Sequence, residues 1–175
     1  MSNLRILRLD EPIIPAKSLG GINLGEKIIQ ADLQEMIKHQ SLLKPEIYTL
    51  VSPFQVRYTL ENSSIYVSVD VRNGKIFHLV ALEGYTGKLF DKITVGMKIG
   101  DAMKLVPDLY YDEAQEQVLC KDILGIAIDP PEVDPPPDLV PDMVISAINI
   151  FVPQIATLRG HQGFWDVMLE EDGKS

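Results

Sequence analysis

Apolar and polar positions in the first half of the chain follow two different periods. Between Glu26 and His39, apolar residues recur at spacings of three and four, which places them on one face of a predicted helix. Runs dense in β-branched and aromatic residues then predict four strands, at 46–51, 54–60, 64–71 and 75–82. In the third run Ile65, Val67 and Val69 alternate with polar residues, so this strand has one apolar and one polar face. The first half therefore predicts one helix followed by an antiparallel meander.

The second half repeats this order. Ile99, Met103 and Val106 mark a short helix that Pro107 ends. Four strand-like runs follow, at 109–111, 115–120, 123–128 and 143–152. The last two runs are expected to face each other across an insertion, residues 129–142. In the first half, the corresponding place holds Asn73-Gly74, which predicts a two-residue hairpin turn.

A ten-residue segment that occurs twice indicates an internal duplication. Residues 22–31 and 93–102 align without a gap and share five of their ten residues. We expect each segment to lead into a helix. Gly25 and Gly96 favour turns at these places over phosphate-binding loops, because each copy offers only Gly-x-Lys.

The predicted fold class is α+β, with two tandem repeats that each consist of a short helix and a four-stranded antiparallel meander. The predicted parts are residues 1–90 with a leading strand, 91–152 with the insertion, and a C-terminal tail, 153–175, that docks and ends in acidic residues. Three arrangements of the two sheets remain open: face to face, edge to edge as one curved sheet, or separated by a linker at Gly84–Gly87.

Composition indicates an ordinary globular protein. Hydrophobic residues make up 46% of the 175 positions, and no apolar run approaches the roughly 18 residues of a membrane span. The N-terminus lacks the apolar stretch of a signal peptide, and the single cysteine, Cys120, excludes an internal disulfide. We therefore expect a cytoplasmic protein that does not associate with membranes.

Charge divides the chain into two unlike halves. Residues 1–92 carry eleven Lys or Arg and ten Asp or Glu, whereas residues 93–175 carry five and fifteen. The net charge of −9 therefore belongs to the second half. An acidic surface repels nucleic acid and attracts a basic partner, so we expect a protein partner and no nucleic acid.

The insertion concentrates this charge. It holds six prolines and five carboxylates, which favours an extended, polyproline-like segment. Two interpretations are open: a solvated insertion, or an acidic arm that binds a basic protein surface. The predicted partner-binding residues are Asp129, Glu132, Asp134, Asp138 and Asp142.

No motif in the chain predicts a catalytic, cofactor or metal site. His39, His78 and His161 lie far apart in sequence, and the insertion has no Asp-x-Asp-x-Asp-Gly pattern for calcium. Cys120 falls in a predicted strand, where a small buried side chain is the ordinary outcome. A glycosidase-like pair of carboxylates stays open, because nothing selects two of the twenty-five Asp and Glu residues.

The two predicted units resemble the repeat architecture of the β-lactamase-inhibitory-protein family. The resemblance covers about residues 19–152 and rests on an Ile-x-Leu/Val-Gly-x-x-Ile motif at 22–28 and 93–99. In size, acidity and lack of catalytic residues the chain also resembles bacterial toxin-immunity proteins. It departs from the secreted inhibitors, which contain disulfides, and no inhibitory residue carries over by position.

These resemblances imply a non-enzymatic protein that occupies another protein's surface. The first hypothesis is therefore a binding module, an immunity or inhibitor protein whose acidic second half covers a basic site on a partner such as a toxin. The alternatives are a small carboxylate-based hydrolase or carbohydrate-binding protein with a cleft between the sheets, and a self-associating structural protein that forms a homodimer.

Overall fold

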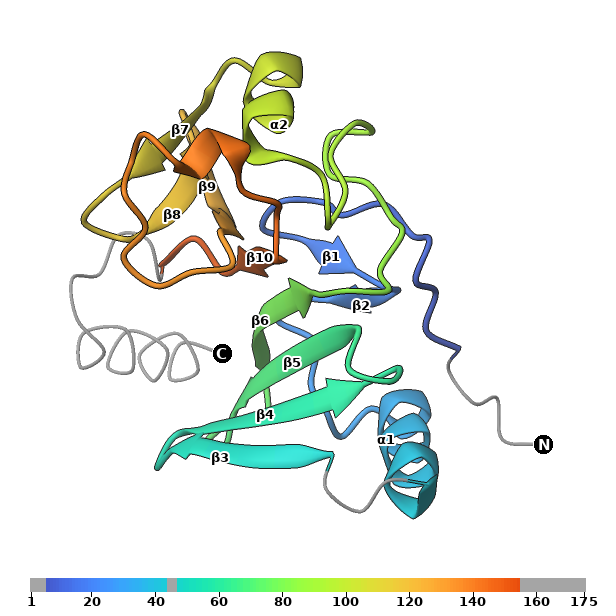
Figure 1. The fold of residues 1–175 in the computed structure, drawn as a ribbon. Helices are drawn as coiled ribbons and strands as arrows, with labels where there is room; N and C mark the ends of the chain where they lie inside the picture. Colours follow the sequence, from blue (N-terminus) through green and yellow to red (C-terminus); the bar gives the residue numbers. More distant parts are fainter. Residues whose placement is uncertain (1–5, 44–46, 155–175) are drawn as a thin grey trace.

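The computed structural model describes residues 6–43 and 47–154, which form two helices, ten strands and one short 3₁₀ helix (Figure 1). The helices are α1 (Ala31–Leu43), α2 (Ile99–Leu105) and the 3₁₀ helix η1 (Val140–Asp142). The strands are β1 (Ser18–Leu19), β2 (Ile22–Asn23), β3 (Tyr48–Ser52), β4 (Gln55–Leu60), β5 (Ile65–Asp70), β6 (Ile76–Ala81), β7 (Leu109–Asp112), β8 (Gln117–Cys120), β9 (Ile123–Asp129) and β10 (Ala147–Phe151). Within these residues, no helix combines the length and the apolar character that crossing a bilayer requires. The tail predicted to dock lies outside the described residues from 155 onward.

Eight strands form one antiparallel sheet in the order β3-β4-β5-β6-β10-β9-β8-β7. The join between its halves is the pairing of β6 with β10, in which Ile148 lies opposite Ala81 and Ile150 opposite Leu79. The predicted α+β class with antiparallel strands is confirmed. Of the three arrangements left open, the strands join edge to edge, through β6 and β10. The architecture still differs from two tandem helix-plus-meander repeats, because all eight strands belong to one sheet and the separate hairpin β1–β2 is added.

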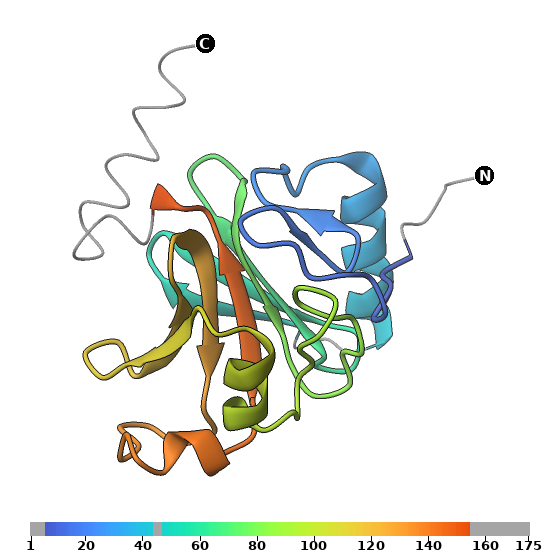
Figure 2. The same cartoon turned by 90° about the horizontal axis from the view of Figure 1, so that it is seen from above.

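The core lies on one face of this sheet. Side chains at alternate positions, among them Ile65, Leu79 and Ile128, pack in one buried cluster with residues of α1, α2 and the β1–β2 hairpin. Figure 2 shows both helices and the hairpin on the same side of the sheet. We call the opposite side the distal face. Period-two alternation along the strands therefore separates a covered apolar face from a second, more polar one.

The two repeated segments make the same backbone hydrogen bonds. Gly25 N donates to Ile76 O at 2.7 Å and Gly96 N to Ile145 O at 2.8 Å. In return, Ile76 N and Ile145 N donate to the carbonyls of residues 26 and 97. Both glycines have a positive φ, 79° and 84°, and open space surrounds the position of a Cβ. Space does not exclude a side chain at either position. The positive φ favours glycine, because other residues adopt this backbone conformation only with strain.

These bonds correct the predicted start of the first helix. We expected a helix from Glu26, but α1 begins at Ala31, because the preceding residues pair with the chain before β6. Ile28 N donates to Gly74 O at 2.9 Å, and the side chain of Ile29 is 69% exposed. The helical spacing of these isoleucines was thus misleading, since tertiary pairing overrides local periodicity.

The predicted two-residue turn at Asn73-Gly74 is also wrong. The connection spans residues 71–75, with Gly74 at φ 71° and the Asn73 side chain accepting a bond from Lys75 N. Asp70, which is fully buried, binds the Arg72 guanidinium through both oxygens at 2.9 and 3.0 Å. The longer turn frees the Gly74 carbonyl to pair with the first repeated segment.

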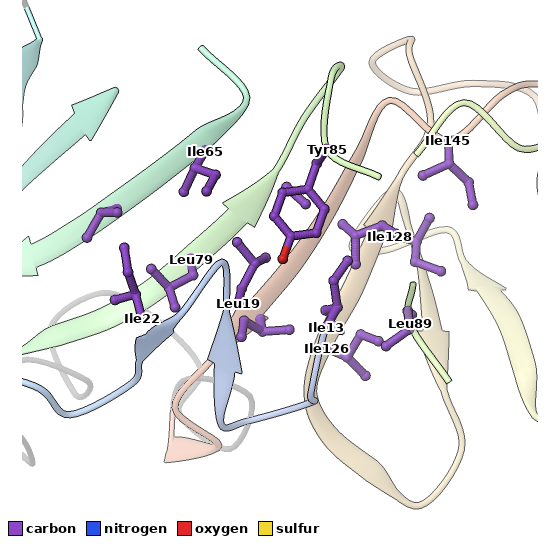
Figure 3. Packing of buried hydrophobic residues seen from close by; sticks show 14 of the residues in the cluster. Ile13, Leu19, Ile22, Ile65, Leu79, Tyr85, Leu89, Ile126, Ile128 and Ile145 are labelled. Atoms are coloured by element: carbon purple, nitrogen blue, oxygen red, sulfur yellow. The ribbon is translucent and has the colours of Figure 1, made fainter. Parts of the chain in front are cut away.

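Residues 84–87, the predicted place for a linker, hold two buried residues, Tyr85 and Gly87, whereas Gly84 and Thr86 are exposed. The Tyr85 ring lies among buried side chains of the hairpin and the sheet (Figure 3). Its hydroxyl accepts a bond from Gly20 N and donates one to Glu11 O, both at 2.8 Å. Burial raises the pKa of Tyr85 to about 12. This side chain ties the N-terminal segment to the connection between the two halves of the sheet.

Replacing Tyr85→Phe should lower the free energy of unfolding by about 1–3 kcal/mol, because Gly20 N and Glu11 O both lose their partner in a buried place. Urea unfolding followed by circular dichroism measures the change. The matched control is Tyr110→Phe, whose side chain is exposed, and which should change stability by less than about 0.5 kcal/mol. Equal losses in the two variants would contradict the role assigned to the Tyr85 hydroxyl.

Candidate binding surface

The insertion and the β7–β8 turn meet at one end of the sheet (Figure 1). Antiparallel pairing of β7, β8, β9 and β10 places the β7–β8 turn and the β9–β10 connection at the same end. The backbone N–H of Asp134 donates to Glu116 Oε2 at 2.7 Å, which joins the tip of the insertion to the turn. Two segments that are 18 residues apart in sequence therefore form one surface.

Four carboxylates on this surface lie near enough to Tyr111 for their charges to act on its hydroxyl. Partial burial and then the negative charges of Glu116, Asp134, Glu113 and Asp112 raise the pKa of Tyr111. We call these four carboxylates the acidic rim. In the part of the chain that the structure describes, none of the four forms an ion pair with a Lys, Arg or His side chain. The rim is thus a concentration of uncompensated negative charge.

The five predicted partner-binding residues do not lie in one place. Glu132, Asp134 and Asp138 are exposed along the insertion. Asp142 is exposed on η1, with Oδ1 3.9 Å from Lys98 Nζ. Asp129 is half-buried at the end of β9 and accepts side-chain hydrogen bonds. Only Asp134 of these five belongs to the acidic rim.

The insertion is anchored at its base, middle and end. Ser146 Oγ donates to the carbonyls of Asp129 and Pro130, at 3.0 and 2.9 Å. The Asp134–Glu116 bond holds the middle. At the end, Val140 is fully buried and η1 packs against α2. The expectation of an extended segment is wrong for residues 136–142. Leu139 N donates to Pro136 O in a turn, and η1 follows, with the Val140 side chain buried.

A row of polar side chains crosses the distal face from β8 to β6. Asp129 accepts from Gln117 Nε2 at 2.6 Å and from Asn149 Nδ2 at 2.9 Å. The Asn149 carbonyl oxygen lies 3.0 Å from His78 Nε2, and since the Asn149 amide already donates to Asp129, His78 is the donor here. Asp129 is therefore engaged inside the protein and is poorly placed to bind a partner directly.

His78 is kept neutral by its surroundings. Burial lowers its pKa most, and the Arg57 charge also lowers it, whereas the bond to Asn149 and the Asp129 charge act in the opposite direction. Arg57 lies over the Tyr66 ring, 4.6 Å from its centroid, and its Nε is buried without a hydrogen-bond partner. The cation is thus held by a ring face instead of a carboxylate.

The surroundings of the Cys120 thiol favour its protonated form. The thiol lies on the core face of β8, beside a shallow hollow of about 620 Å³. Burial and the charges of Asp108 and Asp122 raise its pKa, which keeps it protonated at neutral pH. His78 lies on the other face with β10 and β9 between, and His161 lies outside the described residues. No group of three or more His, Cys, Asp or Glu within residues 6–43 and 47–154 is arranged to hold a metal ion.

Sequence reasoning missed three rim residues, Asp112, Glu113 and Glu116. Their signal was available, because a meander of the predicted runs places the turn after 109–111 at the same end as the insertion. The row formed by Gln117, Asn149 and His78 carried a weaker signal, namely polar residues at alternate positions of apolar strands.

Comparisons with known proteins leave the family of this chain unassigned. No protein-family model matches the sequence, and no curated protein matches it. Among solved structures, the chain is similar to the uncharacterized protein yfeY from Escherichia coli, with a TM-score of 0.46 and 13% identity. That match covers 79% of this chain and 98% of the other.

The stability of the protein should fall as the pH is lowered through the range in which histidine titrates. The pKa of His78 is lowered in the folded chain, whereas in the unfolded chain it lies near 6.5. The contribution of neutral His78 to the free energy of unfolding is therefore fully present above about pH 6.5 and is lost as the pH falls below that value. Urea unfolding at about pH 7.5 and about pH 5.5 measures the loss.

His78→Gln keeps a donor for Asn149 and should reduce this pH dependence. His39→Gln is the matched control, because His39 is exposed on α1. If the wild type and His78→Gln lost stability equally between the two pH values, burial of a neutral imidazole would not explain the effect.

Proposed function

We propose that this chain is a protein-binding module whose acidic rim holds a partner with a basic surface. The observation that carries the proposal is the set of four uncompensated carboxylates on one anchored surface, Asp112, Glu113, Glu116 and Asp134. Glu132, Asp138 and Asp142 extend the same charge along the insertion. Such a field attracts a cationic partner and accelerates its encounter.

The anchoring of the insertion should increase the affinity for a partner, in addition to the effect of its charge. A loop that must be ordered on binding loses conformational entropy, which reduces the net free energy of association. Ser146, the Asp134–Glu116 bond and buried Val140 already order the insertion in the free protein. Val133, between two carboxylates at the tip, is 89% exposed and adds an apolar contact for a partner. The surface is therefore both charged and preorganised.

The kind of partner that fits this surface best is a protein that uses a basic site of its own. A toxin that acts on nucleic acid has such a site, because it must bind phosphates. An immunity or inhibitor protein that covers the site with carboxylates would block it directly. This proposal agrees with the resemblance to immunity proteins. The hydrolase alternative was expected to use a cleft between two four-stranded sheets, and β3 to β10 instead form one continuous sheet.

We also infer that the two halves of the sheet arose by duplication of one helix-plus-meander unit. The support is the pair of matching bonds at Gly25 and Gly96, together with the matching bridges Lys27–Lys75 and Lys98–Val144. In this history the second copy gained the insertion and most of the negative charge. Binding would then belong to the copy that changed.

Removing the rim charge should weaken partner binding at least tenfold, which is about 1.4 kcal/mol. The variant combines Asp112→Asn, Glu113→Gln, Glu116→Gln and Asp134→Asn, which keep the size of each side chain and the acceptor for Asp134 N. Wild-type and variant chains serve as baits in a lysate of the source organism. The captured protein is identified by mass spectrometry, purified, and titrated by calorimetry at two salt concentrations.

The matched control removes four exposed carboxylates from the first half of the chain. It combines Asp10→Asn, Glu35→Gln, Glu83→Gln and Asp91→Asn, and so changes the net charge equally. The control should retain the partner, and wild-type affinity should fall as salt is raised. A rim variant with unchanged affinity and salt dependence would refute the proposal.

A further inference from the structure

The two free edges of the sheet differ in charge and in polarity. One edge is β3, Tyr48–Ser52, which contains no charged residue. Its Tyr48 and Leu50 side chains are 64% and 66% exposed, and Val51 is also exposed. The other edge is β7, Leu109–Asp112, and carboxylates lie at both of its ends. The β3 edge is therefore apolar and neutral, whereas the β7 edge is acidic.

Within residues 6–43 and 47–154, no strand pairs with the outer side of β3. Ile47 is hydrogen-bonded to Thr59 of the neighbouring chain segment, because Thr59 N donates to Ile47 O. Hydrogen-bonded positions recur every second residue, so Thr49, which lies opposite Arg57, also directs its backbone groups towards β4. In an antiparallel pair the residues between such positions turn their N–H and C=O away from the partner strand. Tyr48 and Leu50 therefore direct their backbone groups outward, next to their exposed apolar side chains.

Natural sheets usually protect a free edge. Lysine, proline, an inward-pointing charge or a covering helix prevents pairing with another chain. None of the five residues of β3 is a lysine, a proline or another charged residue. The register shifts after Leu50, but residues 48–50 pair regularly with β4. An edge strand of this composition, with no protecting side chain among its five described residues, is the kind that pairs with another strand.

Charge determines which strand suits this edge. The acidic rim lies at the β7–β8 side of the sheet, and residues 1–92 carry nearly balanced charge. Pairing two copies through β7 would bring two acidic rims together, which is unfavourable. Pairing two copies through β3 puts uncharged residues opposite each other and the rims at the two far ends. A two-fold antiparallel pair of β3 strands also satisfies the same backbone groups in both copies.

We propose that two copies of this chain pair through β3 in an antiparallel, two-fold arrangement, so that their sheets join as one of sixteen strands. Tyr48 and Leu50 of both copies then form a shared apolar strip at the join. This dimer leaves both acidic rims free, and so it is independent of the proposed partner. A short strand pair buries little area, and we therefore expect association in the micromolar range or weaker.

Sedimentation equilibrium of the full chain, from about 1 μM to about 500 μM, tests this proposal. The average mass should rise from 19.5 kDa towards twice that value. Leu50→Lys should keep the chain monomeric, because a charge on the edge opposes pairing. Raising the salt from about 50 mM to about 500 mM should not weaken the dimer, since the interface is uncharged.

Ile29→Lys is the matched control, because it places the same charge on an equally exposed isoleucine away from β3. This variant should dimerise as the wild type does, and circular dichroism checks that both variants fold. A wild-type chain that is monomeric at every concentration would overturn the proposal. A dimer that Leu50→Lys leaves intact would overturn it as well.

Discussion

The antiparallel pairing of β6 with β10 is the interaction on which the arrangement of the molecule depends. Both strands are fully inside the sheet, and their core-facing side chains, Leu79 and Ile150 among them, are completely buried. This pairing sets the two meanders side by side, so that β3 and β7 become the outer edges. The single core face, the position of Tyr85 beneath the join and the placement of the acidic rim at one extremity all follow from it.

The electrostatic division of the chain becomes a spatial one through this sheet. The four strands of each half are neighbours in the sheet, so β3–β6 and β7–β10 lie on opposite sides of the join, although the segment at Ala16 crosses it and donates a backbone bond to Gly125 of β9. Two carboxylates away from the surface are instead satisfied locally: buried Asp70 by Arg72, and half-buried Asp129 by Gln117 and Asn149. Asp70 and Asp129 are thus bound by side chains within the fold, whereas the rim carboxylates form no ion pair within the described residues, although Asp112 and Glu116 accept backbone N–H bonds.

Much of the fold was predictable because strands and helices have different periods. Alternation identified the strands to within a few residues, and Pro107 correctly marked the end of the second helix region. Ile28 and Ile29 misled the prediction, since their spacing suits a helix while their backbone pairs with the chain before β6. The pairing of β6 with β10 could not be predicted, because the alternation of apolar and polar residues in a strand does not indicate which other strand it pairs with. Of the candidate site, Asp134 was among the predicted partner-binding residues, which stay a prediction, whereas including Glu116 required knowledge of which turns share an end.

The pairing of β6 with β10 also has a consequence for the synthesis of the chain. The strand β10 lies about seventy residues after β6, so a nascent chain exposes the inner edge of β6 until residues 147–151 have emerged. During that interval the first meander has two unpaired edges, and a neighbouring nascent chain offers identical strands. Contacts of such long sequence separation also form slowly. The vulnerable period of this protein therefore lies in translation, before its last strand closes the sheet.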